Sequence, residues 1–315
     1  MAGQRALIYN NLSVTLAAGL PILRSIPTSI SGMKGTIPTA FEALAKSVSI
    51  GDGLAETMAK YPRAFSQIDV LVVEAGEVSG NLSECLKLLS HWYRFCDRLR
   101  HIVISGMMLP LILILLVAIL DPATALFLGR INITQYLFQV LGTLALFYGP
   151  AAVIFAVVHL TPRTGFFRRR LDSLTLRIPV LGRAVRQLAL SRYCHLFYML
   201  FKGGLPIVQC AKKASEHTGN ILIANMLSGG ASSAIAGNPV SDGFSQELPK
   251  DFIDSWQIGE QTGELDNVVR HLAKTSTEMS ERVFIELGKW IPKLVYFLVC
   301  LYIIASILKN FAMLR

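Results

Sequence analysis

Charged residues are scarce in this chain of 315 residues. They make up 16% of the composition, against roughly a quarter in an ordinary soluble domain, while the hydrophobic set reaches 52%. A single soluble domain does not need so much apolar surface, and this length leaves room for two folded units besides membrane-spanning segments. The composition therefore predicts a membrane protein with soluble parts.

The sequence also lacks the patterns that carry enzyme chemistry. Its five cysteines include no C-x-x-C pair, and we expect them to be reduced, packed thiols. The six histidines are scattered without the spacing of metal ligands. There is no phosphate-binding G-x-x-x-x-G-K-[ST], no H-E-x-x-H and no G-x-S-x-G. We therefore expect a protein that is not an enzyme and has no catalytic residue, cofactor or metal.

Three apolar runs are long enough to be candidates for membrane spans. The first covers residues 102–120 and the second covers 136–160, and neither contains a charged residue. The third, 291–312, contains Lys293 and Lys309 near its ends, where long side chains can reach the lipid headgroups. Its uncharged centre is short, so a buried soluble helix is the alternative for this third run.

The distribution of arginine predicts the orientation of these spans. Residues 161–192 hold eight arginines against Asp172, whereas 121–135 hold a single arginine. Cytoplasmic loops carry the excess of basic residues, so the arginine-rich segment and the N-terminus are expected on the cytoplasmic side. The predicted order is a first cytoplasmic module at 1–101, a span at 102–120, a periplasmic loop at 121–135, a span at 136–160, a basic linker and second cytoplasmic module at 161–290, and a span at 291–312.

Within the basic linker, Arg168, Arg169 and Arg170 form a cluster. A formal net charge of +9 could also indicate a nucleic-acid-binding protein. The cluster has no interleaved aromatic residues and directly follows a predicted span, so we expect it to face anionic lipid and expect no nucleic-acid partner.

Two short sequence motifs, called the repeated words below, each occur twice in the chain. Gly19-Leu20-Pro21-Ile22 recurs letter for letter as Gly204-Leu205-Pro206-Ile207, 185 residues later. Upstream of each copy an apolar stripe at every fourth position predicts an amphipathic helix. Glycine can end that helix in the left-handed conformation, and proline can begin the next one. We expect Gly19, Pro21, Gly204 and Pro206 to form structural corners between helices.

The second word is G-E-x-[ST]-G-x-L. It begins at Gly76 and again at Gly259. The first glycine of each copy is expected to end a helix, and the hydroxyl residue to cap the following one. The motif residues are Gly76, Glu77, Ser79, Gly80, Gly259, Glu260, Thr262 and Gly263.

The two glutamates leave two interpretations open. In the first, Glu77 and Glu260 each accept hydrogen bonds from turn amides, or pair with an arginine, inside their own module. In the second, each contacts another module, a second subunit or a partner. A single acidic residue in each module does not make a catalytic dyad.

Between the repeated words, the sequence of both modules predicts short helices separated by glycine and proline. No run alternates apolar and polar residues as a strand would, so we expect all-α modules. The repeated words, with Arg177-Ile178-Pro179-Val180-Leu181-Gly182 and Ser191-Arg192-Tyr193, make the chain resemble a known family. This family is the inner-membrane platform proteins of bacterial type II secretion and type IV pilus assembly, the secretion F family. The resemblance covers nearly the whole chain.

The resemblance implies an all-α membrane protein with two cytoplasmic antiparallel six-helix-bundle modules and three transmembrane helices. It implies a scaffold that couples a cytoplasmic hexameric ATPase to the assembly of pilin or pseudopilin subunits, with inner-membrane alignment proteins and further copies of the chain as other partners. The chain starts almost at its first module, without the longer N-terminal arm of many members, which puts contacts of that arm in doubt. The alternative is a transporter or channel component built on a repeated helical module.

Overall fold

A computed structural model describes residues 2–127, 129–160 and 166–312. Within these ranges the regular structure is helical and no strand is formed, which confirms the all-α class. The chain divides into two compact units. Unit 1 contains residues 1–99 and 172–281, and unit 2 contains residues 100–171 and 282–315.

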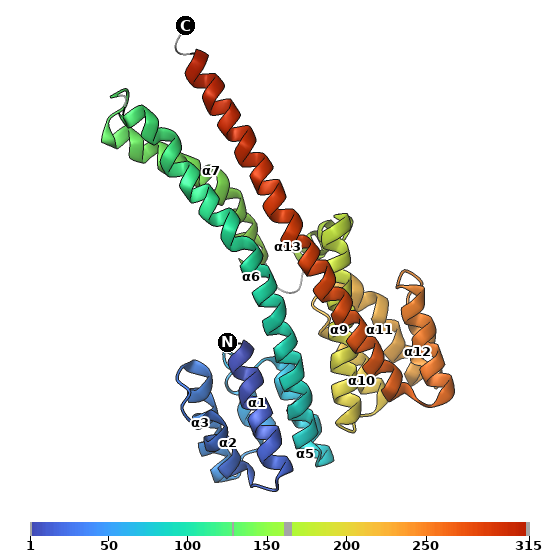
Figure 1. The fold of residues 1–315 in the computed structure, drawn as a ribbon. Coiled ribbons are helices and arrows are strands. Elements are labelled where there is room, and N and C mark those ends of the chain that lie inside the picture. Colours follow the sequence, from blue (N-terminus) through green and yellow to red (C-terminus); the bar gives the residue numbers. More distant parts are fainter. Residues whose placement is uncertain (1, 128, 161–165, 313–315) are drawn as a thin grey trace. The chain divides into compact units, whose positions relative to one another are not determined.

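Unit 1 contains two successive series of helices, coloured blue to teal and yellow to red in Figure 1. The first series is α1 (Ala2–Ala17), α2 (Ile22–Ile30), α3 (Thr36–Ile50), α4 (Leu54–Ala59), α5 (Gln67–Ser79) and the start of α6 (Leu82–Phe127). After α8 (Phe166–Arg177), the second series is α9 (Pro179–Lys202), α10 (Ile207–Glu216), α11 (Ile221–Ile235), the short 3-10 helix η1 (Val240–Gly243), α12 (Lys250–Thr262) and the start of α13 (Leu265–Ala312). The elements follow one another in the same order, with η1 in the place of α4.

The predicted corners are present at the same point in each series. Gly19 has φ 83° and Gly204 has φ 81°, so both adopt the left-handed conformation that glycine permits. Pro21 and Pro206 are the N-cap residues directly before α2 and α10. Both G-L-P-I words therefore form helix-to-helix corners, as the sequence predicts.

The core of each series lies beneath its first helix. The apolar stripes predicted for α1 and α9 face inward, with Ile8 and Leu12 buried in the first series and Tyr193 and Phe197 buried in the second. In the second series the rings cluster around Trp256, whose ring centroid lies 4.9 Å from that of Phe197. Edge-to-face contacts of this kind add to the burial of aromatic surface.

Unit 2 combines α7 (Ile133–Leu160) with the later parts of the long helices α6 and α13. Ile114, Val117 and Val299 form its small core, against which Phe147 packs. Other large apolar side chains on α6, such as Leu109 and Ile112, are exposed. Exposed apolar surface on a long helix is expected where lipid, rather than water, surrounds it.

Two of the described helices are long and apolar enough to cross a membrane. They are α6 and the part of α13 from Leu265 to Ala305. Each runs without interruption from unit 1 into unit 2, and the first and third predicted spans lie within them. The second predicted span lies in α7. Several side chains near the end of α7 are outside the described part of the chain. That α7 crosses the membrane therefore stays a prediction.

Helix α6 continues beyond the first predicted span. The sequence predicts a loop from residue 121, but α6 runs through Asp121 and Pro122 to Phe127. The carboxylate of Asp121 accepts a hydrogen bond of 3.1 Å from the hydroxyl of Tyr302, which also lies 3.1 Å from the hydroxyl of Thr143. Because partners on α7 and α13 satisfy these polar groups, the helix can continue past the charge.

Candidate interaction site

The carboxylate of Glu77 caps a helix of its own series. Glu77 lies near the end of α5, and its Oε1 and Oε2 accept hydrogen bonds from the backbone N–H groups of Leu54 (2.7 Å) and Ala55 (3.0 Å). These are the first two residues of α4, whose N–H groups have no partner inside the helix. A negative charge also complements the positive end of the helix dipole. Glu77 therefore joins the end of α5 to the start of α4.

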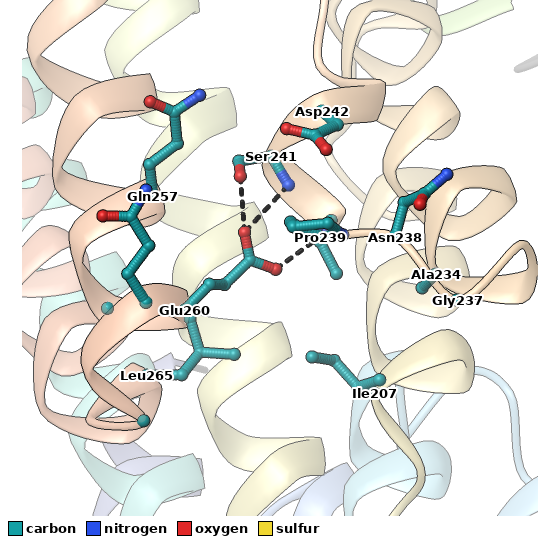
Figure 2. A pocket seen from close by; sticks show the side chains of 14 residues that line it. Ile207, Ala234, Gly237, Asn238, Pro239, Ser241, Asp242, Gln257, Glu260 and Leu265 are labelled. Atoms are coloured by element: carbon teal, nitrogen blue, oxygen red, sulfur yellow. Dashed lines mark hydrogen bonds between the residues drawn. The ribbon is translucent and has the colours of Figure 1, made fainter.

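Glu260 makes the equivalent contact in the second series (Figure 2). Its Oε1 accepts from the N–H of Val240 (2.6 Å), and its Oε2 accepts from the N–H of Ser241 (3.1 Å). The hydroxyl of Ser241 donates a further short hydrogen bond to Oε2. The hydrogen bonds that the first interpretation expects are thus present in both series.

A hollow of about 550 Å³ adjoins Glu260. Figure 2 shows Glu260 reaching from α12 toward Ser241, with Asn238 on the opposite side and Ile207 and Leu265 at the lower end. Three donors occupy the carboxylate of Glu260, so it is held in a capping role.

The glycines of the repeated word have different roles from those predicted. Gly80 and Gly263, not the first glycines, end helices α5 and α12, with φ values of 71° and 74°. Gly76 and Gly259 lie inside those helices. A Cβ added at Gly76 would lie 3.0 Å from the Cβ of Cys85, and one at Gly259 would lie 2.9 Å from the Cβ of Val268. The first glycine therefore permits close packing against the next helix.

The hydroxyl residues of the word close the same turn in both series. The Oγ of Ser79 donates to the carbonyl of Ala75 (2.8 Å) and accepts from the N–H of Asn81 (3.3 Å). The Oγ1 of Thr262 donates to the carbonyl of Ile258 (2.8 Å) and accepts from the N–H of Glu264 (3.4 Å). Each hydroxyl therefore accepts from the N–H group of the residue just before the next helix, which is where capping was predicted.

Sequence reasoning missed a buried polar cluster in the first series. Asp69 is fully buried, and its Oδ2 accepts hydrogen bonds from the N–H of Ser66 (2.7 Å) and the hydroxyl of Tyr93 (2.8 Å). Burial raises the pKa of the Asp69 carboxyl group. Arg5 donates to the hydroxyl of Tyr93 (3.0 Å). The capping box S-x-x-D at Ser66 was the sequence signal that could have identified Asp69.

The basic cluster of the linker lies in helix α8. Arg170 is exposed, while the side chains of Arg168 and Arg169 lie outside the described part of the chain. Among the described residues, no group of His, Cys, Asp and Glu is arranged to hold a metal ion.

Repeated helical series, long apolar helices and paired glutamate caps define an all-α membrane protein with internal repetition. A family model described as "Type II secretion system (T2SS), protein F" matches residues 8–128 and 193–308. The two matched segments start 185 residues apart, which is also the offset of the G-L-P-I words. The chain belongs to the type II secretion system protein F family.

Curated proteins similar to the chain carry names from two machines. The type IV pilus assembly protein PilC of Pseudomonas aeruginosa is 26% identical, with 85% of this chain and 77% of that protein covered. The type II secretion system protein F of Aeromonas hydrophila is 27% identical, with coverage of 96% and 84%. The PilC protein of Thermus thermophilus is 26% identical, with coverage of 85% and 71%.

Proposed function

We propose that this protein is the inner-membrane platform of a type IV pilus or type II secretion assembly machine. The observation that carries the proposal is the family match over both halves of the chain, together with relatives named for these two machines. The long apolar helices α6 and α13 support insertion in the membrane. Unit 1 supplies a folded region outside the apolar helices, which a scaffold needs to hold partners.

In the proposed arrangement the two helical series are cytoplasmic six-helix modules, and the N-terminus is cytoplasmic. Three helices cross the membrane, with residues 121–135 in the periplasm. The excess of arginine between 161 and 192 supports this orientation. Arg168, Arg169 and Arg170 would then contact the anionic headgroups of the cytoplasmic leaflet.

The proposed partners are a cytoplasmic hexameric assembly ATPase, pilin or pseudopilin subunits, and inner-membrane alignment proteins. The role is mechanical: the ATPase acts on unit 1, and the chain transmits its movement to subunits that are inserted from the membrane. The last helix of each series, α6 or α13, is long and continues into unit 2. Each module therefore has a continuous helical connection to the apolar part of the protein.

The proposal is tested in the bacterium that carries the gene. Deleting the gene should abolish surface pili or secretion, and the full chain should restore them. Affinity-tagged full chain, isolated in mild detergent, should retain the assembly ATPase and pilin. A deletion strain with normal pili and normal secretion would overturn the proposal.

A further inference from the structure

A glycine followed four residues later by a proline, G-x-x-x-P, occurs twice in the chain and nowhere else. One copy runs from Gly106 to Pro110 in α6. The other runs from Gly288 to Pro292 in α13. The two copies begin 24 and 23 residues after the first residues of these helices. The last helix of each series therefore carries the same motif at nearly the same distance from its start.

The two glycines of the motif lie against each other within unit 2. A Cβ added at Gly106 would lie 3.3 Å from both the Cα and the carbonyl oxygen of Gly288. Two helix backbones can approach so closely only where neither carries a side chain at the contact. Helices α6 and α13 therefore make a backbone contact at the two motifs.

The prolines remove one hydrogen bond from each helix at this contact. In an α-helix the carbonyl of a residue accepts from the N–H group four residues later, and proline has no N–H group. In each motif the proline is the fourth residue after the glycine, so the carbonyl that loses this bond belongs to the glycine at the contact. Helices bend most readily where these bonds are interrupted. Both helices therefore have a weak point at the same place.

After the prolines, the two helices are packed together in unit 2. Ile114 and Val117 of α6 and Val299 of α13 form the core of this unit. The hydroxyl of Tyr148 on α7 also donates to the carbonyl of Leu111 on α6 at 3.0 Å. These contacts join α6, α7 and α13 into one packed body beyond the motifs.

Before the glycines, the two helices are joined again in unit 1. Arg98 of α6 and Glu281 of α13 form an ion pair, with 2.8 Å between Nε and Oε1. Their chain neighbours Leu99 and Ser280 are buried in the same unit. Because α6 and α13 are joined on both sides of the motifs, neither helix can bend at its motif unless the other bends too.

We propose that the two G-x-x-x-P motifs form a paired hinge at which α6 and α13 bend together. The missing hydrogen bonds lower the resistance to bending, and the absence of a Cβ at Gly106 and Gly288 lets the helices roll on each other. The two helical series form one compact unit, so they move together when the hinge bends, and neither helix unfolds. The hinge does not depend on the proposed platform role, whereas its use in an assembly machine rests on that role.

A distance distribution measured in lipid nanodiscs tests the hinge. Spin labels are attached to Ile50→Cys in unit 1 and Leu116→Cys in unit 2, because both positions are exposed. The full chain carries Cys96→Ser and Cys300→Ser, since these two native cysteines are not fully buried. Pulsed electron paramagnetic resonance then gives the distribution of distances between the labels. We expect a broad distribution for the chain with both prolines.

Replacing the prolines should make this distribution narrower. Alanine restores the missing N–H group and favours a helix, so these variants keep the fold. We expect Pro110→Ala combined with Pro292→Ala to reduce the width at least about twofold. Because the helices are joined on both sides of the motifs, either substitution alone should narrow the distribution nearly as much as both together. An unchanged width in the double variant would overturn the hinge, and unchanged widths in both single variants would overturn the pairing.

Two controls separate bending at the motifs from other changes. Pro122→Ala removes a proline of α6 that lies after the labelled residue, and it should leave the width unchanged. Labels at Ile50→Cys and Ile235→Cys both lie in unit 1 at exposed positions, and they should give the same distribution in every proline variant. A width that changes for this second pair would place the motion inside unit 1 and contradict the proposal.

The use of the hinge is tested in the deletion strain. A chain with Pro110→Ala and Pro292→Ala, present in the membrane at the normal level, should restore pili or secretion to at most about a tenth of the level that the unsubstituted chain gives. Pro122→Ala should restore it fully. Full restoration by the double variant would show that the machine works without the hinge, and this use would be wrong. If the deletion itself leaves pili and secretion normal, the platform role fails, while the distance measurement still decides whether the hinge exists.

Discussion

At the scale of single residues, Glu77 and Glu260 connect two helices through hydrogen bonds to backbone N–H groups. Hydrogen bonds to a charged acceptor contribute more than neutral ones, about 1.5–3 kcal/mol. Each carboxylate also occupies amides that the short helix cannot satisfy itself. The two sites differ in one respect: the hydroxyl of Ser241 is a third donor to Glu260, whereas the described donors to Glu77 are the two backbone N–H groups.

Glutamine at either position should therefore destabilise the fold. The glutamine side chain keeps one accepting oxygen but turns an NH₂ group toward an N–H donor. We expect Glu77→Gln to lower the free energy of unfolding by about 1–3 kcal/mol, and Glu260→Gln to lower it more. Urea or thermal melting of the purified full chain measures both effects.

The matched controls are Glu42→Gln and Glu247→Gln, which alter exposed glutamates of the first and second series and should change stability by less than about 0.5 kcal/mol. The second interpretation makes a different prediction. If the melting of Glu77→Gln and Glu260→Gln is unchanged while capture of the ATPase falls, these carboxylates contact a partner.

His195 should make stability depend on pH. Burial, with a smaller contribution from the nearby His91, lowers the pKa of His195 from 6.5 to about 4. Between these pH values the unfolded chain binds a proton at this position and the folded chain does not, so the free energy of unfolding falls as pH falls. The loss should reach roughly 2–3 kcal/mol near pH 4. The dependence weakens as pH rises past 6.5 and is negligible above about pH 7.5.

The measurement compares the unsubstituted chain with His195→Gln, which cannot titrate. Melting temperatures at pH 7.5, 6, 5 and 4.5 should decline more steeply for the chain with histidine. Parallel curves for the two proteins would show that folding does not lower the pKa of His195.

The sequence predicted which residues are repeated in the two series, but it did not predict all of the groups that these residues contact. Two glutamates in two copies of one word indicated a shared role, and the spacing of G-E-x-[ST]-G placed each near a helix end. The donor groups of Leu54 and Val240 lie about twenty residues away along the chain, and only the packing of helices brings them together. The cluster around Asp69 was missed because Tyr93 lies 24 residues from Asp69 along the chain and Arg5 lies farther still.

At the scale of elements, the first glycine of the repeated word governs how closely two helices pack. Because the Cα of Leu82 and the side chain of Cys85 lie against Gly76, α5 and α6 leave no space for a methyl group there. This is why the prediction that Gly76 ends a helix is wrong. Composition marks glycine as a helix breaker, but only the tertiary contact distinguishes a cap from a close approach.

Gly76→Ala tests this close approach. The added Cβ would lie 3.0 Å from the Cβ of Cys85 and from the Cα of Leu82, so the helices must separate. We expect a loss of about 1–3 kcal/mol in the free energy of unfolding, although alanine alone favours a helix. Gly53→Ala is the control, because φ is −64° there and the nearest contact of an added Cβ is 3.8 Å. A stabilised Gly76→Ala chain would contradict the packing described here.

The boundaries of the helices were predicted to different degrees. The corners at Gly19 and Gly204 could be predicted because glycine and proline act locally. Helix α5 begins at Gln67 next to the capping residue Ser66, but it extends to Ser79, beyond the end predicted at Gly76. In the second series η1 stands where the first has α4, and no residue pattern distinguished a single 3-10 turn from a short α-helix.

At the scale of the whole molecule, the two predicted kinds of region correspond to two compact units. The repeated series fall in unit 1, and the apolar parts of α6 and α13 fall in unit 2 with α7. Hydrophobic runs and repeated words were sufficient to separate these regions, because both depend on residue type alone. The number of spans and the side on which each segment lies depend on the surrounding membrane, which acts on charge as well as length.

Reporter fusions to the full chain decide between three spans and two. If α6, α7 and α13 all cross, a periplasm-active reporter should work at position 130, fail at 175 and work after residue 315. If only α6 and α13 cross, the reporter should work at 175 and fail at the C-terminus. We expect the first pattern, because the eight arginines between 161 and 192 would otherwise lie outside. A cytoplasm-active reporter at the same positions is the control and should give the opposite activities. Periplasmic activity at 175 would reject the three-span topology together with the cytoplasmic position of the second series.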